Sequence, residues 1–122
     1  MARSDTITIY HNPRCTKSRA ALALLVERGI QPVIVEYLQT PPTAVELRAI
    51  LHKLGLKPEQ IVRKGEAIYK QNFAGVALDD DEWLEVLVKN PVLIERPIVV
   101  NGNRAAIGRP TEHIEALLKA PV

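Results

Sequence analysis

Residues 6–10 alternate polar and apolar side chains, which predicts a β-strand, and Asn12-Pro13 ends that strand. From Ser18 onward the apolar residues recur at helical spacing, and Gly29 suits the end of this helix. One face of the helix is expected to be buried, and its apolar members are Ala21, Leu22, Leu25 and Val26. Residues 32–38 form an apolar run that predicts a second strand, parallel to the first.

The middle of the chain is predicted to be a helical insert that covers about residues 41–92. Thr43 followed by Glu46 has the pattern of a capping box, and Gly55 is expected to end the helix that they begin. Further helical segments are predicted over residues 58–62, 66–73 and 81–89. The acidic residues 79–81 open the last segment, and we interpret them as a solvated helix start rather than a metal site.

The last third of the chain returns to strands. Residues 98–100 and 103–107 are predicted strands joined by an Asn101-Gly102 turn, and residues 111–118 form the last helix. The order β-α-β, helical insert, β-β-α predicts an α/β protein with a four-stranded mixed sheet flanked by helices. This order matches a thioredoxin-like fold, in which a reactive cysteine follows the first strand. Because that fold carries a cis proline before its third strand, the Arg96-Pro97 bond is expected to be cis.

The length of 122 residues suits one domain, so we expect residues 1–122 to form a single domain. A net charge of +2 does not suggest nucleic-acid binding, and no apolar run approaches the ~20 residues that span a bilayer. No signal peptide is evident and one cysteine cannot form an internal disulfide, so a cytoplasmic location is expected. Cys15 and the three histidines lack metal-ligand spacing, and we expect no bound metal or other cofactor.

Cys15, the only cysteine, lies between the first predicted strand and the first predicted helix. Unpaired backbone N–H groups and the positive end of the helix dipole favour an anion at such a position. Arg14, Lys17 and Arg19 add positive charge nearby. A lone cysteine is often a small buried hydrophobic residue, but these cations favour a reactive thiolate with a lowered pKa.

Arg63, Arg96 and Arg109 each lie at the boundary of a predicted element. The antiparallel hairpin would bring residues near 96 and 108 together, so two of these arginines are expected to converge at one end of the sheet. Guanidinium groups match tetrahedral oxyanions, although many surface arginines are only solvated. A thiolate near converging arginines predicts nucleophilic attack on an oxyanion, with the cations stabilising its negative charge.

A chain with one thiol has no second sulfur to resolve its own intermediate, so its electrons are expected from an external thiol such as glutathione or a glutaredoxin. Ser18 stands at the fourth position of a Cys-x-x-Ser spacing, where its hydroxyl can hydrogen-bond a thiolate. His11 lies four residues before Cys15. It could stabilise the thiolate or order the loop, and packing in the turn is an equal alternative.

Several motifs occur in order at fitting spacings: Tyr10-His11-Asn12-Pro13-Arg14-Cys15 with Ser18-Arg19, Tyr37-Leu38-x-Thr40-Pro41-Pro42, Arg63-Lys64, Glu95-Arg96-Pro97-Ile98-Val99-Val100 and Gly108-Arg109-Pro110. Together they resemble the glutaredoxin-coupled arsenate reductase (ArsC) family, and most closely its small bacterial branch with a Cys-x-Lys-Ser-Arg signature. The resemblance extends from about residue 7 to residue 118.

The resemblance implies that the Cys15 thiolate attacks arsenate, that glutathione adds to the arsenic as a co-substrate, and that glutaredoxin removes the glutathione while arsenite leaves. It implies that Arg63, Arg96 and Arg109 hold arsenate and that His11 helps to form the thiolate. We expect Ser18 to bind the substrate together with Cys15 and the arginines. The biological role that the resemblance implies is arsenic detoxification.

One departure from the family concerns the residues after the cysteine. The better characterised arsenate reductases carry Gly and then Thr or Ser there, whereas this chain has Thr16 and Lys17. Glycine lets the backbone approach an anion closely, whereas the β-branched side chain of Thr16 narrows the loop and Lys17 adds a charge. These differences bear on which anion fits, so the expected substrate is arsenate or a similar oxyanion.

Two other functions are alternatives. The same fold hosts the Spx regulators, which bind the RNA polymerase alpha subunit and commonly carry Cys-x-x-Cys. Ser18 removes that redox switch, and the retained arginines favour an enzyme. A thiol oxidoreductase that acts on another substrate is the remaining alternative.

Overall fold

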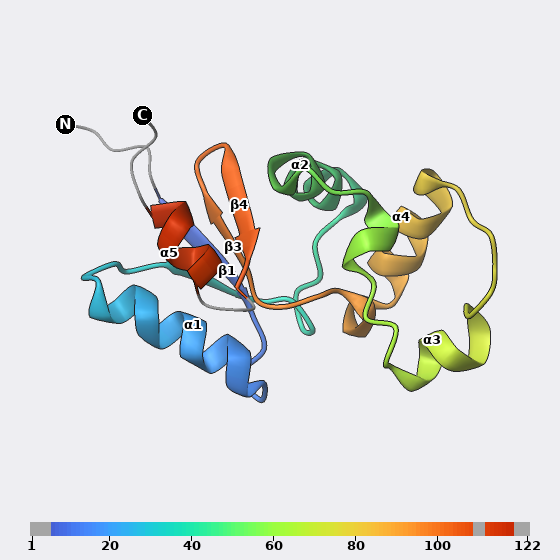
Figure 1. Ribbon diagram of the computed structural model, residues 1–122, viewed down its shortest axis with the longest axis horizontal. Coiled ribbons are helices and arrows are strands. Elements are labelled where there is room, and N and C mark those ends of the chain that lie inside the picture. Colours follow the sequence, from blue (N-terminus) through green and yellow to red (C-terminus); the bar gives the residue numbers. More distant parts are fainter. Residues whose placement is uncertain (1–5, 109–111, 119–122) are drawn as a thin grey trace. The chain divides into compact units, whose positions relative to one another are not determined.

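The computed structural model describes residues 6–108 and 112–118, and the chain divides into two compact units (Figure 1). The first unit contains Met1–Thr40 and Arg96–Val122, and the second unit contains Pro41–Glu95. The second unit covers the predicted helical insert and extends it to Glu95. That residues 1–122 act as a single domain stays a prediction.

The first unit is built on a four-stranded mixed sheet in the order β2-β1-β3-β4. β1 pairs in parallel with β2 and antiparallel with β3, and β3 pairs antiparallel with β4. The elements of this unit are β1 (Ile7–His11), α1 (Thr16–Glu27), β2 (Val33–Glu36), β3 (Ile98–Asn101), β4 (Arg104–Ile107) and α5 (Glu112–Leu118). The predicted thioredoxin-like α/β arrangement is confirmed.

One face of the sheet packs against α1 and α5, which lie next to each other in Figure 1. The buried residues of this core are Ile7, Ile9, Ala21, Leu25, Val99, Ile114 and Leu117. The buried face of α1 also includes Ser18, but Val26 is 60% exposed, so the prediction that Val26 belongs to the buried face is wrong. Each residue turns a helix by about 100°, so a face that contains Ala21 and Leu25 leaves Val26 to one side.

The apolar run in the second strand does not mark a buried strand. Val33 and Ile34 are 49% and 47% exposed, because β2 lies at the edge of the sheet. Apolar character alone therefore placed the strand correctly along the chain but did not distinguish an edge strand from a central one.

The hairpin turn lies one residue later than its sequence signal suggested. Asn101 pairs with Arg104, so the two loop residues are Gly102 and Asn103 rather than Asn101-Gly102. Gly102 has a φ of 63°, and Asn103 has no positive φ. These φ values fit a type II′ turn, which takes glycine at its first central position, whereas a type I′ turn would need positive φ at both.

The Arg96-Pro97 peptide bond is cis, as predicted. The carbonyl of Pro97 accepts a hydrogen bond from the Gly108 N–H at 2.9 Å. A Cβ atom on Gly108 would lie 2.6 Å from Ile114 Cδ1 and 3.1 Å from Pro97 Cγ. Glycine at this position therefore lets α5 and Pro97 pack closely at the end of β4. Pro97 is the residue that follows Arg96, so this packing lies next to Arg96 in the chain.

The second unit is helical, with the elements α2 (Ala44–Leu54), η1 (Pro58–Ile61), α3 (Ala67–Asn72), α4 (Asp80–Lys89) and η2 (Pro91–Leu93), where η denotes a 3₁₀ helix. Thr43 begins α2: its hydroxyl accepts a hydrogen bond from the Glu46 N–H at 3.1 Å, and the Glu46 carboxylate accepts one from the Thr43 N–H at 2.8 Å. Gly55 ends the helix with a φ of 71°. The predicted capping box and the predicted helix end are both confirmed.

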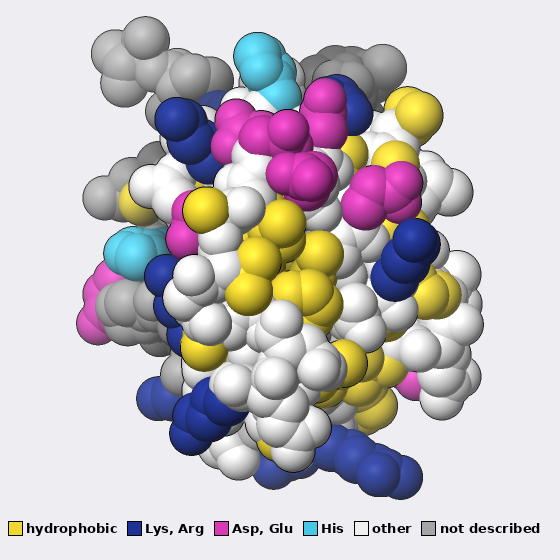
Figure 2. Space-filling view, turned by 90° about the vertical axis from the view of Figure 1, so that its right-hand side faces the viewer, with side chains coloured by type: hydrophobic (Ala, Val, Ile, Leu, Met, Phe, Trp, Pro, Cys, Tyr) yellow, Lys and Arg dark blue, Asp and Glu magenta, His cyan; other side chains and the backbone are white. Residues whose placement is uncertain are grey.

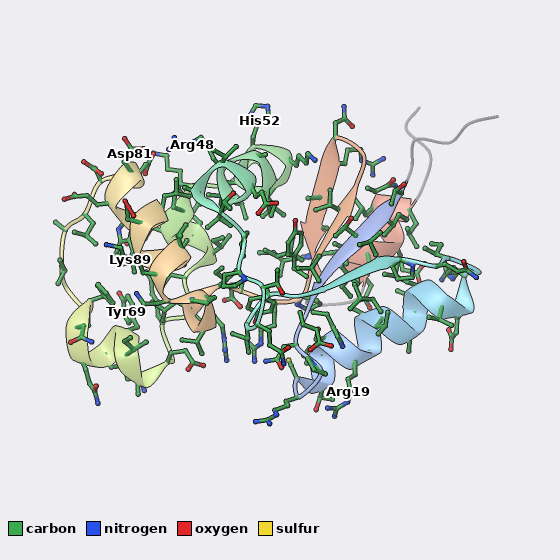
Figure 3. All side chains as sticks on the ribbon, turned by 180° about the vertical axis from the view of Figure 1, so that it is seen from behind. Arg19, Arg48, His52, Tyr69, Asp81 and Lys89 are labelled. Carbon is green, nitrogen blue, oxygen red and sulfur yellow. The ribbon has the colours of Figure 1, made fainter. Side chains whose placement is uncertain are left out.

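Acidic residues 79–81 form the N-cap and the first residues of α4, so they are a helix start, as interpreted from the sequence. Asp79 accepts a hydrogen bond from the Glu82 N–H at 2.8 Å, and Asp80 and Asp81 lie in the first turn. Asp81 also pairs with Arg48 at 3.4 Å; both side chains are labelled in Figure 3. Acidic side chains in the first turn of α4 are stabilised by the positive end of its helix dipole, and Figure 2 shows acidic side chains gathered on one face of the molecule.

Packing in the second unit centres on Trp83 of α4. The centroid of its ring system lies 6.3 Å from the ring centroid of Tyr69 and 6.0 Å from that of Phe73. Two backbone hydrogen bonds then join the segment that carries Arg63 to the end of the unit. The Arg63 N–H donates to the Leu93 carbonyl at 2.7 Å, and the Glu95 N–H donates to the Ile61 carbonyl at 2.9 Å. The Arg63 segment thus runs beside the residues that precede Arg96 in the chain.

Replacing Gly108 by alanine should lower the free energy of unfolding by about 1–3 kcal/mol, because the new methyl group overlaps Ile114 and approaches Pro97. Urea unfolding measures this change. Gly65→Ala is the matched control: a Cβ there meets no atom within 4 Å, so its stability should change by no more than about 0.5 kcal/mol. Equal stability of the two variants would contradict the close packing at Gly108.

Candidate functional site

Cys15 is the residue at which the loop after β1 becomes α1. It is the N-cap of α1, with extended φ and ψ of −96° and 124°, and its side chain is partly exposed. Its N–H donates to the Asn12 carbonyl at 3.0 Å, and its own carbonyl accepts the first helical hydrogen bond from the Arg19 N–H at 3.0 Å. The backbone therefore fixes the sulfur at the positive end of the helix.

The pKa of the Cys15 thiol lies below its ordinary value. Burial by itself would raise this pKa, but the opposing interactions are stronger. They are hydrogen bonding from the backbone N–H groups of Ser18 and Lys17, and the positive charge and side-chain hydrogen bonding of Arg96. The structure therefore agrees with the predicted lowering of the thiol pKa, which favours ionisation of a partly exposed sulfur.

Arg96 is the cation that acts on the sulfur. Its Nε and Nη1 atoms are buried and have no hydrogen-bond partner within the described part of the chain. Buried guanidinium nitrogens without a partner carry a desolvation cost, which an anion beside Cys15 would offset. A guanidinium next to a thiolate, with donors left over, is suited to hold an oxyanion at the sulfur.

The cations next to Cys15 in the sequence are not the main cause of its lowered pKa. The causes are the backbone N–H groups and Arg96 named above, and the side-chain charges of Arg14, Lys17 and Arg19 are not among them. Arg19 instead bonds the loop: its Nη1 donates to the Pro13 carbonyl at 2.9 Å, and Figure 3 shows its side chain at the start of α1. A lowered thiol pKa was expected from these three cations, but Arg96, a cation from a distant part of the chain, is the one named among its causes.

A buried hydrogen-bond network holds the other side of the loop. The Ser18 hydroxyl is completely buried; it shares a 2.6 Å hydrogen bond with His11 Nδ1 and accepts one from the Asn12 N–H at 3.0 Å. The Ser18 hydroxyl is thus hydrogen-bonded to His11 and to the loop backbone. The part of Ser18 that lowers the Cys15 pKa is its backbone N–H. Substrate binding by the Ser18 side chain stays a prediction, and what the structure describes is a role in ordering the loop.

His11 is buried at the end of β1. Burial lowers the pKa of its imidazole, and Arg19 lowers it further, whereas Glu36, its partner across β1 and β2, raises it. The net lowering favours a neutral ring near neutral pH. A neutral ring bonded to Ser18 fits the loop-ordering alternative given for His11 above.

The structure describes no contact of the other two predicted arginines, Arg63 and Arg109, with the Cys15 sulfur. Arg63 lies in the second unit, where its Nη1 pairs with Glu66 at 2.8 Å. Cys15 belongs to the first unit, and the approach of Arg63 to its sulfur stays a prediction. Arg109 lies outside the described residues, so the predicted convergence of Arg96 and Arg109 also stays a prediction.

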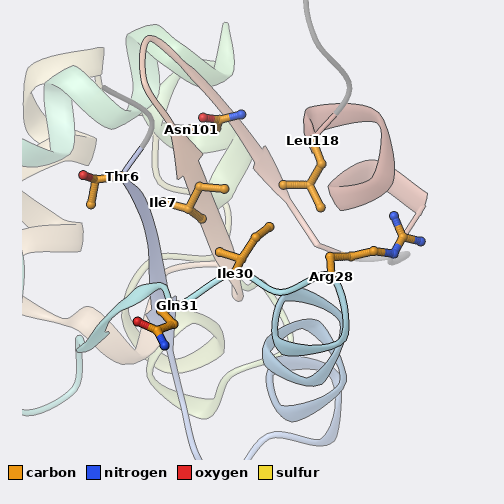
Figure 4. A pocket seen from close by; sticks show the side chains of 7 residues that line it. All are labelled: Thr6, Ile7, Arg28, Ile30, Gln31, Asn101 and Leu118. Atoms are coloured by element: carbon orange, nitrogen blue, oxygen red, sulfur yellow. The ribbon is translucent and has the colours of Figure 1, made fainter. Parts of the chain in front are cut away.

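A pocket of about 580 Å³ in the first unit lies away from Cys15 (Figure 4). Ile7, Asn101 and Arg28, among others, line it, so it is at the start of β1, whereas Cys15 follows the end of that strand. No group of three potential metal-ligating side chains occurs within residues 6–108 and 112–118. None of the helices that the structure describes has the length and apolar character needed to cross a membrane.

Comparison with known proteins identifies close relatives. Residues 10–117 match the family described as "ArsC family". The chain is 49% identical over 114 residues to a protein of Neisseria meningitidis serogroup A named "Arsenate reductase", covering 92% of this chain and 97% of that protein. It is 46% identical to a protein of Escherichia coli K12 named "Uncharacterized protein YfgD", covering 88% of this chain and 92% of that protein. Among solved structures, "Arsenate reductase from Vibrio cholerae" has a TM-score of 0.89 and 41% identity, covering 95% of this chain and all of that one.

Replacing Arg96 by alanine should raise the pKa of Cys15, because the variant loses a neighbouring cation and a hydrogen-bond donor to the thiolate. The pH dependence of Cys15 alkylation by iodoacetamide, which is neutral, reports this pKa. Lys17→Ala is the matched control, because it removes a charge but keeps the backbone N–H that acts on the sulfur. The assignment of Arg96 fails if its removal leaves the midpoint where it is in the wild type.

Replacing Ser18 by alanine should lower the free energy of unfolding by about 1–3 kcal/mol, because the Asn12 N–H and His11 Nδ1 lose a buried partner. Urea unfolding at neutral pH measures the change. Thr16→Ala removes an exposed hydroxyl from the same helix turn and should change stability by less than about 0.5 kcal/mol. A Ser18→Ala variant as stable as Thr16→Ala would contradict the network.

Proposed function

Because the chain belongs to the ArsC family, we propose that it is an arsenate reductase that uses Cys15 as its nucleophile and glutathione with glutaredoxin as its reductants. The observation that carries the proposal is the thiol of Cys15 at the start of α1, with its pKa lowered by backbone donors and by Arg96. The named arsenate reductases among its relatives support the substrate.

In the proposed reaction the Cys15 thiolate attacks arsenic, and a sulfur–arsenic bond forms as one arsenate oxygen leaves as water after protonation. Arg96 faces the sulfur and offsets the negative charge of the arsenate oxygens. Arg63 and Arg109 are proposed to complete this oxyanion site. The buried, neutral His11 and Ser18 keep the loop in place so that the sulfur and its N–H donors stay aligned.

Reduction needs two electrons, which one thiol cannot supply. Glutathione adds to the arsenic while a second arsenate oxygen leaves as water, and a glutaredoxin thiolate then attacks the glutathione sulfur. The bond between the glutathione sulfur and arsenic breaks with its electron pair left on arsenic, which passes from the +5 to the +3 state while still bound to Cys15. Water then replaces the Cys15 sulfur on arsenic, and arsenite leaves. The two external thiols end as a mixed disulfide and Cys15 returns as a thiolate, so the electrons balance. A reducing compartment such as the cytoplasm belongs to the same proposal, because free thiols persist there.

The regulatory alternative is not favoured. The named relatives given above include arsenate reductases, and Arg63 and Arg96 are present at the expected positions. A thiol oxidoreductase for another oxyanion uses the same sulfur and the same arginine, so it differs from the first proposal in substrate rather than in mechanism.

The test is a coupled assay in which arsenate, glutathione, glutaredoxin, glutathione reductase and NADPH are combined with the protein. The wild type should give arsenate-dependent NADPH oxidation, and Cys15→Ser should give none above background, because a serine hydroxyl at neutral pH is not ionised. Thr16→Ala, which leaves the thiol and its donors in place, is the control for intact folding. Absence of turnover at millimolar arsenate would reject arsenate as the substrate.

A further inference from the structure

Arg14 and Lys17 flank Cys15, and both side chains are exposed. Neither makes an ion pair with any side chain in the described part of the chain, and neither charge is among the causes of the lowered Cys15 pKa. Arg19 differs from them, because its guanidinium is bonded to the Pro13 carbonyl and, more weakly, to Thr16. The two exposed cations that flank Cys15 in the sequence therefore have no ion-pair partner in the described part of the chain, and neither is named as a cause of the lowered thiol pKa.

Lys17 is also unfavourable for its own helix. It lies in the first turn of α1, which contains no acidic residue, and a cation there opposes the helix dipole. Arg14 lies just before the same helix start. Helix α4 shows the usual arrangement in this protein, with Asp80, Asp81 and Glu82 in its first turn. A local feature that opposes stability without a compensating contact is typical of a functional position.

We infer that Arg14 and Lys17 recognise the carboxylates of the thiol that reduces the enzyme, and so select an acidic small thiol over a neutral one. The inference rests on the proposed function, because it concerns the partner that meets the same sulfur. Glutathione has the required chemistry, since it carries two carboxylates on either side of its thiol. The exposed guanidinium of Arg14 and the exposed ammonium of Lys17 flank the partly exposed Cys15 in the sequence and have the charge to pair with such a dicarboxylate.

The test uses thiol–disulfide exchange in place of arsenate turnover. The Cys15 thiolate attacks oxidised glutathione, a Cys15–glutathione disulfide forms, and one glutathione thiolate leaves. Rates are compared for oxidised glutathione, for its tetraethyl ester, which lacks the carboxylate charges, and for the neutral bis(hydroxyethyl) disulfide. The variants are wild type, Arg14→Gln with Lys17→Gln, and Arg28→Gln. Arg28 is the matched control, because it removes a charge at the opposite end of α1.

The double variant should react about three- to tenfold more slowly with oxidised glutathione at low ionic strength, and less than about twofold more slowly with the ester and the neutral disulfide. High salt should remove most of the difference, because these charges are exposed. Arg28→Gln should match the wild type with all three reagents. An equal loss with charged and uncharged reagents, or no loss with either, overturns the inference.

The two proposals can fail separately. If the wild type shows charge-selective exchange but no arsenate turnover, the proposed substrate is wrong and the recognition of an acidic thiol stands. If arsenate is turned over, the double variant should raise the KM for glutathione about three- to tenfold and leave the KM for arsenate unchanged. Turnover with an unchanged KM for glutathione overturns the inference and leaves the proposed function intact.

Discussion

The balance of forces on one sulfur atom is the interaction on which the site depends. Burial opposes the ionisation of Cys15, and the backbone N–H groups of Ser18 and Lys17 together with Arg96 favour it more strongly. The helix start and Arg96 come from distant parts of the chain, and both belong to the unit built on the mixed sheet. The sheet thus brings a donor cluster and a guanidinium to the same sulfur, which neither segment could achieve alone.

The surroundings of the sulfur divide into groups that hold the loop and groups that remain open. Ser18, His11 and Arg19 are engaged with the loop, so they fix its course. Arg96 retains buried donor atoms, and Arg14 and Lys17 face solvent. This division separates the rigid part of the site from the part that can accept an oxyanion and its reducing partner.

Local sequence rules predicted those features that local structure decides. The capping box of Thr43 and Glu46, the glycine end of α2 and the position of Cys15 before α1 depend on residues within one or two helical turns. Arg96 was also singled out from sequence, because it stands at the boundary before the third strand and within one of the motifs that resemble the family. The fold class followed from the order of these elements, and the observed sheet agrees with it.

Features that depend on side-chain direction could not be predicted in the same way. Spacing placed Lys17 and Arg19 near Cys15, but it did not show that Arg96 and two backbone N–H groups are the main causes of the lowered thiol pKa. Spacing suggested that the Ser18 hydroxyl could hydrogen-bond the thiolate. In the structure Ser18 is on the buried face of α1, and its hydroxyl bonds His11. The backbone donors to the sulfur carry no residue-specific signal, although any cysteine at a helix N-cap position can have them.

The orientation of Ser18 also decides what kind of redox chemistry this loop can support. A protein that stores oxidising equivalents in a Cys-x-x-Cys motif needs a second sulfur close enough to the first to form a disulfide. Here the fourth position is a buried serine, whose oxygen joins His11 to the main chain. The loop therefore has one sulfur, and its fourth position orders the main chain in place of supplying a second electron donor.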